Sequence, residues 1–368
     1  MILVINSGSS SIKYKLYQNN KEIYSNIEQE VKSHHDAILK IFENLICEKL
    51  ISSFNCLDGV GHRVVHGGEY FSNSVLIDES VISKLIKLIP LAPLHNPANI
   101  DAIKIIASSY PSLKQVAVFD TAFHQTIPKK NYIYPIDYKF YQNNHIRRYG
   151  FHGTSHEYVA MKAAKLLNKD LKQCNLITLH LGNGASACAI KDGKSYDTSM
   201  GFTPLEGLMM GTRCGDIDPA IIFYMINNLK LNPNEIDNIL NKQSGFKGIC
   251  GKSNLKDILK DDTNDFNRLA LDIYIEKIKK YIGSYFVQLE KVDAIVFTGG
   301  IGENSSYITE QICKSLSCIG VELDKRNDLK KDKEDTKKIS SKNSKIDIFV
   351  IKTDEEFSIY SQTKSLII

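Results

Sequence analysis

The chain has 368 residues, 43% of them apolar and 24% charged, so it can bury a core of ordinary size and is long enough for two domains. This composition excludes an intrinsically disordered protein. The 46 basic and 42 acidic side chains give a net charge of +4 without a sustained basic stretch, so the charge pattern does not indicate a nucleic-acid partner.

The sequence indicates neither a membrane anchor nor a secretory route. No window approaches the ~18 consecutive apolar residues that a bilayer-spanning helix needs. The first residues, MILVINSGSSS, lack the basic segment and the long apolar run of a signal peptide. The cysteines are scattered without a C-x-x-C pair, which favours reduced thiols over a zinc or dithiol site. We therefore expect a cytoplasmic protein with no membrane association.

The predicted elements begin with two strands joined by a short polar turn. Ile2–Ile5 is an apolar run, and Ile12–Tyr17 alternates apolar and polar side chains, as a half-buried strand does. The same pattern returns at Leu176–Leu181 and Ala185–Ile190, on either side of a Gly-Asn-Gly turn. Two such units so far apart indicate an internal duplication, although Gly-rich hairpins are also common by themselves.

A second repeat and several helical patterns support this interpretation. Leu57–Val65 and Val292–Phe297 are both strand-like and both lie just ahead of a Gly-Gly pair. Apolar residues at helical spacing predict helices at Ser80–Leu88, Ala98–Ser108, His156–Leu167 and Leu269–Leu289. The segment Asp324–Ser344 is rich in Lys and Asp and is typical of a solvated helix end and loop. Strands that alternate with helices predict an α/β fold.

The turn after the first strand, Asn6–Ser11, has the composition of a phosphate-binding loop. Backbone N–H groups at glycine and serine can converge on an anion, and the short hydroxyls of Ser9 and Ser11 add donors without filling the space. Lys13 follows on the return strand, where its ammonium group would approach a phosphate oxygen. A plain hairpin with an exposed lysine is the alternative, and the sequence leaves both open.

Charged residues are concentrated at the ends of two strands in the first half of the chain. Arg63 lies within the Gly-flanked run Gly61–Gly68, and a guanidinium group binds carboxylate or phosphate through two parallel N–H donors. Asp120 directly follows the strand Gln115–Phe119. It either caps the next helix or is a carboxylate that orients an arginine or contacts the reacting group. Because catalytic groups gather at strand ends in α/β folds, we favour a functional role for Arg63.

Two further polar groups lie near the middle of the chain. His152 precedes a Gly-Thr-Ser turn that opens a helix, and we expect it to donate a hydrogen bond to a charged ligand. A zinc site is conceivable there, but no H-E-x-x-H pattern supports one. Arg213 again lies between glycines, and the following Asp216 and Asp218 are also suited to capping the next helix. Arg63 and Arg213 together would suit a transferring phosphoryl group, whose charge is spread over its equatorial oxygens.

Three more segments have both a functional and a structural interpretation. Thr298–Asn304 is a Gly-rich turn between a strand and a helix, as in nucleotide sites, but it has neither a P-loop nor a dinucleotide fingerprint. Thr353–Glu356 follows the strand Ile346–Ile351 and either holds Mg²⁺ with a carboxylate or simply begins an acidic helix. Pro93–Pro97, which contains Leu94, is either a pocket wall or a rigid helix entry.

Nine segments, in their order along the chain, resemble the acetate kinase (acetokinase) family. They are VINSGSSSIKYKL, GHRVVHGGEYF, LAPLHNPANI, VFDTAFHQTIP, RRYGFHGTSHEYV, HLGNGASACAI, TPLEGLMMGTRCGDIDP, FTGGIGEN and TDEE. The resemblance runs from end to end and implies a duplicated actin/hexokinase-like (RNase H-like) α/β fold, with a nucleotide cleft between two domains. It further implies domains of 1–120 plus 357–368 and of 121–356, with hinges near Thr121 and Glu356.

The same resemblance implies reversible transfer of the terminal phosphoryl group of ATP to acetate, which gives acetyl phosphate and ADP. Mg²⁺, or Mn²⁺ in its place, would accompany the nucleotide, and a homodimer is implied. A carboxylate is already an anionic nucleophile at neutral pH, so the main difficulty is repulsion between anions, which a metal ion and two arginines would relieve during in-line transfer. Asp120 is therefore better interpreted as an organiser of arginine or metal than as a base.

Individual roles also follow from the resemblance. Catalytic roles fall on Asp120, His152, Arg213 and Arg63, and the metal site on Asn6 and Glu355. The substrate would meet Arg63 and an apolar pocket of Val65, Leu94, Phe151 and Pro204. The nucleotide-binding residues implied are Lys13, Ser9, Ser11, His180, Leu181, Gly182, Asn183, Gly184, Asn254, Leu255, Lys256, Gly300, Ile301, Gly302, Glu303 and Asn304.

Two departures from the family pattern and two alternative functions qualify these expectations. Asn254-Leu255-Lys256 stands where Asp-x-Arg is usual near the adenosine, so nucleotide preference is expected to be looser. Cys214 stands where serine is usual, which predicts sensitivity to oxidation.

The alternative functions are a propionate kinase with the same motifs and a non-catalytic nucleotide-binding switch protein on the same fold. A mere nucleotide switch would have no use for cations on the acetate side such as Arg63 and Arg213.

Overall fold

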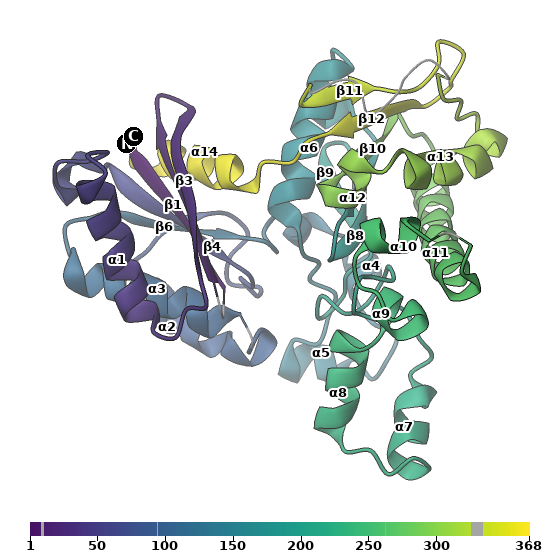
Figure 1. Ribbon diagram of the computed structural model, residues 1–368, viewed down its shortest axis with the longest axis horizontal. Helices are drawn as coiled ribbons and strands as arrows, with labels where there is room; N and C mark the ends of the chain where they lie inside the picture. The colour runs from purple at the N-terminus through teal and green to yellow at the C-terminus, as the bar shows by residue number, and fades with distance from the viewer. Residues whose placement is uncertain (9–10, 94, 262, 325–333) are drawn as a thin grey trace. The chain divides into compact units, whose positions relative to one another are not determined.

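A computed structural model describes residues 1–8, 11–93, 95–261, 263–324 and 334–368. The chain divides into two compact units, which are each built from separate stretches of sequence (Figure 1). Unit 1 comprises Met1–Gln125, Gly153–Ser155 and Asp354–Ile368, and unit 2 comprises Thr126–His152 and His156–Thr353. The functional domain boundaries expected from the sequence stay a prediction.

Unit 1 is built on a mixed sheet with the strand order β3-β2-β1-β4-β6-β5. Strands β1, β4 and β6 run parallel. Strand β2 pairs antiparallel with β1, β3 pairs antiparallel with β2, and β5 pairs antiparallel with β6. The strands are β1 (Ile2–Ser7), β2 (Ser11–Gln18), β3 (Lys21–Gln29), β4 (Gly59–Val64), β5 (Val75–Leu76) and β6 (Gln115–Phe119).

Unit 2 contains a second mixed sheet with the order β11-β12-β10-β7-β8-β9. Strands β7, β10 and β12 run parallel, and β8, β9 and β11 are antiparallel to their neighbours. The strands are β7 (Leu176–Leu181), β8 (Ala185–Lys191), β9 (Lys194–Thr198), β10 (Ala294–Thr298), β11 (Thr336–Lys338) and β12 (Asp347–Ile351).

The two sheets have the same topology. When the second order is reversed, β7, β8 and β9 take the places of β1, β2 and β3, and β10, β12 and β11 those of β4, β6 and β5. The parallel and antiparallel pairings also agree strand by strand. The internal duplication expected from the two sequence repeats is therefore confirmed.

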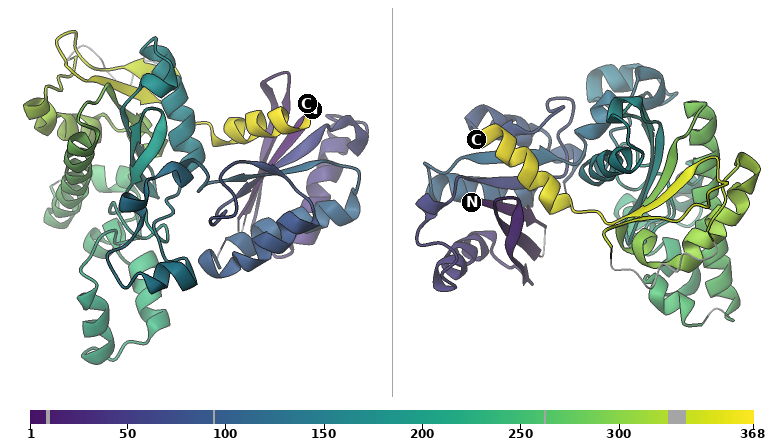
Figure 2. Two further views of the ribbon diagram at one scale, coloured as in Figure 1. Left: turned by 180° about the vertical axis from the view of Figure 1, so that it is seen from behind. Right: turned by 90° about the horizontal axis from the view of Figure 1, so that it is seen from above.

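The sheet of unit 1 buries both faces, because side chains of alternate strand residues point to opposite sides. Leu3 and Ile5 pack with α1 and α3 on one face, in a core that includes Phe42. Ile2 and Val4 pack with α14 on the other. Figure 2 shows α14 lying along this sheet. The helices of the unit are α1 (His34–Cys47), α2 (Glu79–Lys87), α3 (Asn96–Ser109) and α14 (Glu355–Ile367), with short 3₁₀ turns at Phe54–Cys56, Ile89–Leu91 and Phe123–Thr126.

Unit 2 has more helices than unit 1 in the described part of the chain, and several of them are short. The longest, α11 (Asp265–Leu289), packs on β7 and β8 and begins at Asn264, whose side chain accepts hydrogen bonds from two backbone N–H groups of the first turn. The other helices are α4 (Lys129–Tyr132), α5 (Lys139–Asn144), α6 (Gly153–Leu166), α7 (Ala220–Asn227), α8 (Pro233–Lys242), α9 (Gly245–Cys250), α10 (Leu255–Leu259), α12 (Gly299–Asn304) and α13 (Ser306–Ser315), with 3₁₀ turns at Leu171–Gln173 and Leu316–Ile319.

In both units, the chain leaves a strand of the sheet and later enters a helix that belongs to the other unit. The first long helix after β6 is α6, which belongs to unit 2 from His156 onward. The helix after β12 is α14, which belongs to unit 1. The core of unit 1 therefore includes a helix that is remote in sequence from its strands.

Several sequence-based expectations need correction. The Lys- and Asp-rich segment Asp324–Ser344 was expected to be a helix end and loop, but it contributes strand β11, which pairs with β12; its residues 325–333 lie outside the described part. The turn expected at Thr298–Asn304 forms the short helix α12. Strand β3 is polar and sits at the sheet edge, so it lacked the apolar alternation that marks a strand. In the described part of the chain, no helix is long and apolar enough to cross a bilayer.

Candidate functional site

In unit 1, Arg63 and Asp120 form an ion pair at the ends of neighbouring parallel strands. The Nε of Arg63 donates to Oδ1 of Asp120 over 3.0 Å, and its Nη2 contacts Oδ2, so the guanidinium group binds the carboxylate with two bonds. The Arg63 side chain is 22% exposed and that of Asp120 is 1% exposed. Burial alone would lower the pKa of Arg63, but the Asp120 carboxylate raises it above its usual value. The helix-cap alternative for Asp120 is not what the structure shows.

Carboxylate and amide oxygens surround this pair. Nη1 of Arg63 donates to Oδ1 of Asn6 over 3.3 Å. The Glu355 carboxyl, at the start of α14, has its pKa raised to about 7, chiefly by burial, since the favourable charge of Arg63 is opposed by Asp120 and Glu356. Burial therefore disfavours the charged form of Glu355 more than the nearby cations favour it.

The expected phosphate-binding turn of unit 1 is only partly described. Ser9 lies outside the described residues, as does Leu94 of the expected acetate pocket. Lys13 forms an ion pair with Glu356 at 2.7 Å, and its side chain is 42% exposed. Ser11 closes the turn through its carbonyl oxygen, which accepts the N–H of Gly8 at 2.8 Å. A phosphate that approached Lys13 would therefore compete with the Glu356 carboxylate.

Val65, expected in the apolar pocket, lies at the end of β4 and is fixed by an asparagine. Its backbone N–H donates to Oδ1 of Asn99 at 3.1 Å, and the Nδ2 of the same side chain donates to the carbonyl of Ser7 at 2.6 Å. Asn99 is 2% exposed. This buried amide, on α3, joins the ends of β1 and β4, and the sequence analysis did not single it out.

In unit 2, His152 occupies an unusual backbone position. It is the residue before α6 and has a left-handed conformation with φ 57° and ψ 24°. Such a conformation is uncommon outside glycine and costs of order 1–3 kcal/mol, so it is found where the surrounding structure or a function requires it. The His152 ring stacks on that of His180, with ring centroids 4.2 Å apart, and its Nδ1 lies 2.9 Å from the Ser186 hydroxyl. Phe151, next to it, is buried.

Arg213 is held by neutral groups. Its Nη1 donates to the carbonyl of Pro204 at 3.1 Å and approaches Sδ of Met210 at 3.5 Å. Among the residues that the structure describes, no carboxylate forms an ion pair with this guanidinium group. Burial lowers the pKa of Arg213. The site thus presents a positive charge that no protein anion neutralises.

The glycine turn after β7 lies next to this charge. A Cβ placed on Gly184 would be 3.5 Å from Nε2 of His152 and 3.8 Å from Nη1 of Arg213. A Cβ on Gly182 would be 3.9 Å from the backbone nitrogen of Gly300, so the two expected nucleotide-binding turns of unit 2 also come together. These glycines leave room for a ligand beside donors of hydrogen bonds.

Among the remaining expected nucleotide-binding residues, Glu303 and Asn254 form hydrogen bonds to the nearby backbone. A Glu303 carboxylate oxygen accepts hydrogen bonds from the backbone N–H groups of Gly299 and Thr353, at 2.9 and 3.0 Å. Asn254 caps α10 by accepting the N–H of Lys256 at 2.9 Å. Leu181, Gly302 and Leu255 are buried, while Asn183, Ile301, Asn304 and Lys256 are partly or fully exposed.

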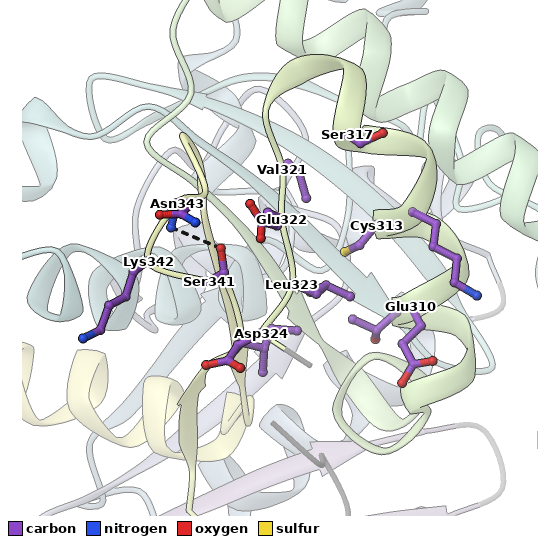
Figure 3. Close-up of a pocket in the computed structure, with 13 residues that line it drawn as sticks. Glu310, Cys313, Ser317, Val321, Glu322, Leu323, Asp324, Ser341, Lys342 and Asn343 are labelled. Carbon is purple, nitrogen blue, oxygen red and sulfur yellow. Dashed lines mark hydrogen bonds between the residues drawn. The ribbon is translucent and has the colours of Figure 1, made fainter. Parts of the chain in front are cut away.

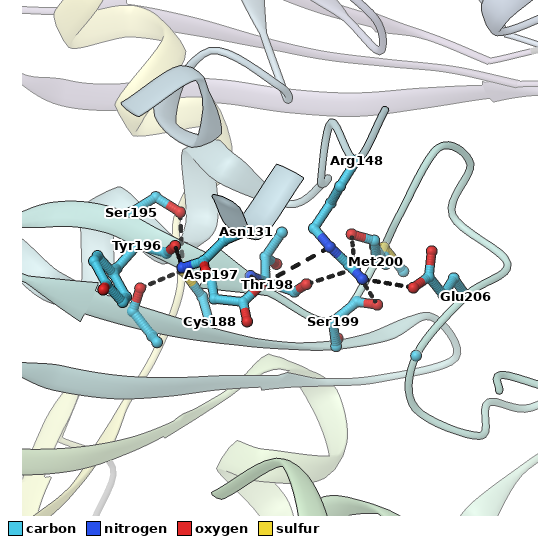
Figure 4. A network of polar contacts seen from close by, with 12 residues as sticks. Asn131, Arg148, Cys188, Ser195, Tyr196, Asp197, Thr198, Ser199, Met200 and Glu206 are labelled. Atoms are coloured by element: carbon cyan, nitrogen blue, oxygen red, sulfur yellow. Dashed lines mark hydrogen bonds and ion pairs between the residues drawn. The ribbon is translucent and has the colours of Figure 1, made fainter. Parts of the chain in front are cut away.

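A network around Arg148 holds the backbone at the end of β9 (Figure 4). The Nη1 of Arg148 lies within hydrogen-bonding distance of the carbonyl groups of Thr198, Ser199 and Met200, at 2.8 to 3.2 Å. Its Nη2 donates to Glu206 at 2.6 Å. Asp216, expected as a helix cap, instead accepts the N–H of Gly207 at 2.8 Å. The sequence analysis did not identify Arg148, because nothing local distinguishes it from a surface arginine.

Cys214 is a poor candidate for a reactive thiol. Its Sγ donates to the carbonyl of Gly215 at 3.1 Å, and burial raises the thiol pKa above its usual value. The sensitivity to oxidation expected from its place beside Arg213 is therefore not supported. The eight cysteines are all free of disulfide bonds.

A cavity in unit 2 lies away from these residues. It has a volume of about 890 Å³ and lies between α13 and the segments that flank β11 (Figure 3). Its lining includes Cys313, Val321, Leu323, Ile339 and Lys342. The expected site residues do not contribute to this lining.

Duplicated α/β units with guanidinium groups and glycine turns at their strand ends define an enzyme suited to anionic substrates such as phosphates. The model of the acetokinase family matches residues 16–361. The chain is 49% identical to the acetate kinase of Sulfurovum sp. (strain NBC37-1), over 100% of this chain and 98% of that relative. The chain therefore belongs to the acetokinase family, a family of kinases.

Solved structures agree with this assignment. The crystal structure of acetate kinase from Porphyromonas gingivalis has a TM-score of 0.95 to this chain and 39% identity, with 100% and 99% of the two chains covered. A propionate kinase from Francisella tularensis has a TM-score of 0.91 and 42% identity, with 99% of each chain covered. The two-domain fold expected from the resemblance is thereby confirmed, and the alternative of a non-catalytic switch protein is not supported.

Proposed function

We propose that the protein catalyses the reversible transfer of the terminal phosphoryl group of ATP to acetate, which gives acetyl phosphate and ADP. The observation that carries this proposal is the Arg213 guanidinium, which has no carboxylate partner among the described residues and lies beside Gly184 and His152. An unneutralised cation with space next to it is suited to a multiply charged anion. Family membership supplies the identity of the anions.

The roles of the unit 2 residues follow from charge. Arg213 would stabilise the equatorial oxygens of the migrating phosphoryl group, and His152 would donate a hydrogen bond to one of them. The turns at His180–Gly184 and Gly300–Asn304 would offer backbone N–H groups to the nucleotide.

In unit 1, Arg63 would bind the acetate carboxylate while Asp120 holds the guanidinium in one orientation. The ion pair between them supports this division of labour. Since acetate is ionised at neutral pH, no base is required, and Asp120 acts through Arg63. Asp120→Asn should therefore lower acetate affinity together with turnover; normal values of both would contradict the role.

Mg²⁺ fits the residues of unit 1. Mg²⁺ is usually held by one or two carboxylates together with substrate phosphates and waters, so a large protein cage is not required. The Glu355 carboxyl is buried near Arg63, and Asn6 offers an amide oxygen to the same arginine. We propose Asn6 and Glu355 as the residues that hold the ion. When bound, it would neutralise charge on the nucleotide phosphates.

Propionate is the second candidate substrate, because a propionate kinase structure is about as similar to this chain as an acetate kinase structure. One methylene group is worth only about 1–3 kcal/mol in an apolar pocket, so few residue changes separate the two specificities.

We further propose a homodimer in the cytoplasm. Support for the dimer comes from α7 and the residues after it, where Ile221, Phe223, Tyr224 and Leu229 are 40 to 63% exposed. Free cysteines support a reducing compartment. Phe223→Glu should convert the dimer to a monomer in analytical ultracentrifugation, whereas Val287→Glu, at an exposed apolar residue of α11, should not.

The test of the activity is acyl phosphate formation, trapped with hydroxylamine, from ATP and Mg²⁺ with acetate, propionate or butyrate. We expect turnover with acetate, and its loss in Arg63→Ala and Arg213→Ala. Arg268→Ala is the matched control, since this arginine is 58% exposed on α11. A preference for propionate would keep the mechanism and change the substrate. Absence of turnover with every carboxylate would contradict the proposal.

A further inference from the structure

A chain of hydrogen bonds runs inward from His152. Its Nδ1 lies 2.9 Å from the hydroxyl oxygen of Ser186, which in turn lies 2.8 Å from Nε2 of His156. Nδ1 of His156 lies 2.7 Å from the hydroxyl oxygen of Thr178. Ser186, His156 and Thr178 are all fully buried. Ser186 comes from β8, Thr178 from β7 and His156 from α6.

Two arrangements of the protons satisfy this chain when both imidazole rings are neutral and the Ser186 hydrogen is used within it. A serine hydroxyl has a single hydrogen, so Ser186 donates to one imidazole and accepts from the other. If it donates to Nδ1 of His152, His156 donates to Ser186 through Nε2–H, and Thr178 donates to Nδ1 of His156. If it donates to His156, every bond of the chain is reversed.

The surroundings of Thr178 distinguish the two arrangements. In the first, its hydroxyl hydrogen is used in the bond to His156. In the reversed arrangement, Thr178 accepts from His156, and its own hydrogen is buried without an acceptor among the residues that the structure describes. A buried donor that makes no bond loses its hydration without compensation. The first arrangement is therefore favoured, and it leaves the proton of His152 on Nε2.

We propose that Ser186 is a positioning residue that fixes the tautomer of His152, so that Nε2 carries the hydrogen donated to the phosphoryl group. Nε2 is the ring nitrogen that lies 3.5 Å from the Cβ position of Gly184, beside Arg213. The opposite tautomer would place a lone pair there and repel an anionic oxygen. The catalytic part of this inference depends on the proposed function, whereas the tautomer itself does not.

The tautomer is measured by nitrogen-15 NMR of protein labelled in its histidine rings, at a pH where the ring is neutral. The signals of His152 are identified by their absence from His152→Asn. We expect a protonated Nε2 and an unprotonated Nδ1 in the wild type, and a mixture of tautomers in Ser186→Ala. A wild-type ring protonated at Nδ1, singly or together with Nε2, would overturn the inference whatever the activity is.

Kinetics test the consequence for catalysis. In Ser186→Ala, kcat should fall about 10- to 100-fold, as for other residues that orient a functional histidine, with KM values for acetate and ATP near those of the wild type. Ser186→Thr keeps the hydroxyl and should recover most of the loss. Ser195→Ala is the control, because this serine is equally buried in the same sheet and its hydroxyl contacts the Cys188 thiol.

The outcomes separate the inference from the function on which it depends. An inactive wild type would contradict the proposed activity but leave the tautomer measurable. An active wild type and an equally active, folded Ser186→Ala would overturn the positioning role. Thermal melts of all variants show whether they fold; if Ser186→Ala does not fold, the wild-type tautomer and the activity of Ser186→Thr decide.

Discussion

Arg63 in unit 1 and Arg213 in unit 2 are both partly buried, in units whose sheets have the same topology, yet the protein surrounds the two positive charges with different groups. Arg63 is bound by the Asp120 carboxylate, and its pKa is raised. Arg213 is held by a carbonyl and a thioether, and burial lowers its pKa. One cation is therefore stabilised by the protein, while the other is left for a ligand to stabilise. The comparison teaches that an arginine's partners, more than its burial, determine how its removal changes the free energy of unfolding.

The largest expected effect is on catalysis by Arg213→Met. Loss of a group that stabilises developing negative charge lowers kcat by about 10²–10³-fold. The melting temperature should stay the same or rise, because the substitution removes a buried charge that no protein anion compensates. Activity assays and calorimetry on the same preparation check both. A marked drop in melting temperature would show that Arg213 is a structural cation after all.

Arg63→Met should lower the free energy of unfolding in addition to the turnover. It leaves the buried Asp120 carboxylate without its partner, at a cost of about 3 kcal/mol, towards the low end for such pairs because Arg63 is partly exposed. Urea unfolding measures this loss. The double variant Arg63→Met, Asp120→Asn should recover much of it, since no buried charge remains. If the single variant were as stable as the wild type, the contrast between the two arginines would disappear.

His62, next to Arg63 on β4, gives a pH dependence that is confined to unit 1. Burial lowers its pKa to about 4 from an ordinary 6.5, so the imidazole is kept neutral in the fold. The unfolded chain binds a proton below pH 6.5 and the folded protein does not, so stability is lost as the pH falls. From this group alone, we expect a loss of about 2 kcal/mol between pH 7.5 and pH 5.

The matched variant is His62→Gln, which keeps an N–H donor for Gln115 but does not titrate. Chemical unfolding at several pH values should show a shallower pH dependence than in the wild type. Equal slopes in both proteins would mean that His62 is protonated in the folded state.

The smallest effect is expected at Cys214. The burial that lowers the pKa of Arg213 raises that of the neighbouring thiol, since both shifts disfavour the charged form. Wild type and Cys214→Ser should therefore lose activity at the same rate in dilute hydrogen peroxide. Protection by the substitution would show that the thiolate forms readily and that the surroundings of Arg213 are wetter than the structure indicates.

The sequence predicted elements whose own residues carry a periodic signal. Strands β1 and β7 and helices α2 and α3 were found within a few residues of their bounds, because their apolar patterns are local. Strand β3 and helix α1 were missed, the first because it is polar. The positions of Arg63 and Arg213 were recognised from glycine-flanked motifs.

Pairings between distant residues could not be found in the same way. The ion pair of Arg63 with Asp120 spans 57 positions, and the bridge from Ser186 to His152 spans 34. Such contacts depend on which strands become neighbours in the sheet. The local sequence around each residue does not show which distant residue it will contact. Ser186 sits in a strand of small side chains, where a serine is as suited to packing as to hydrogen bonding.

The helix that follows β12 also has a consequence for the order in which the chain can fold. Ile2, Val4 and Val118 of the sheet of unit 1 are covered by Ile359 and Tyr360 of α14, which a ribosome makes after the strands of unit 2. Until then one face of that sheet has no cover, and its apolar side chains remain exposed to other chains. Unit 1 therefore cannot finish folding when its own strands have been synthesised; it completes its core only after unit 2 has been made.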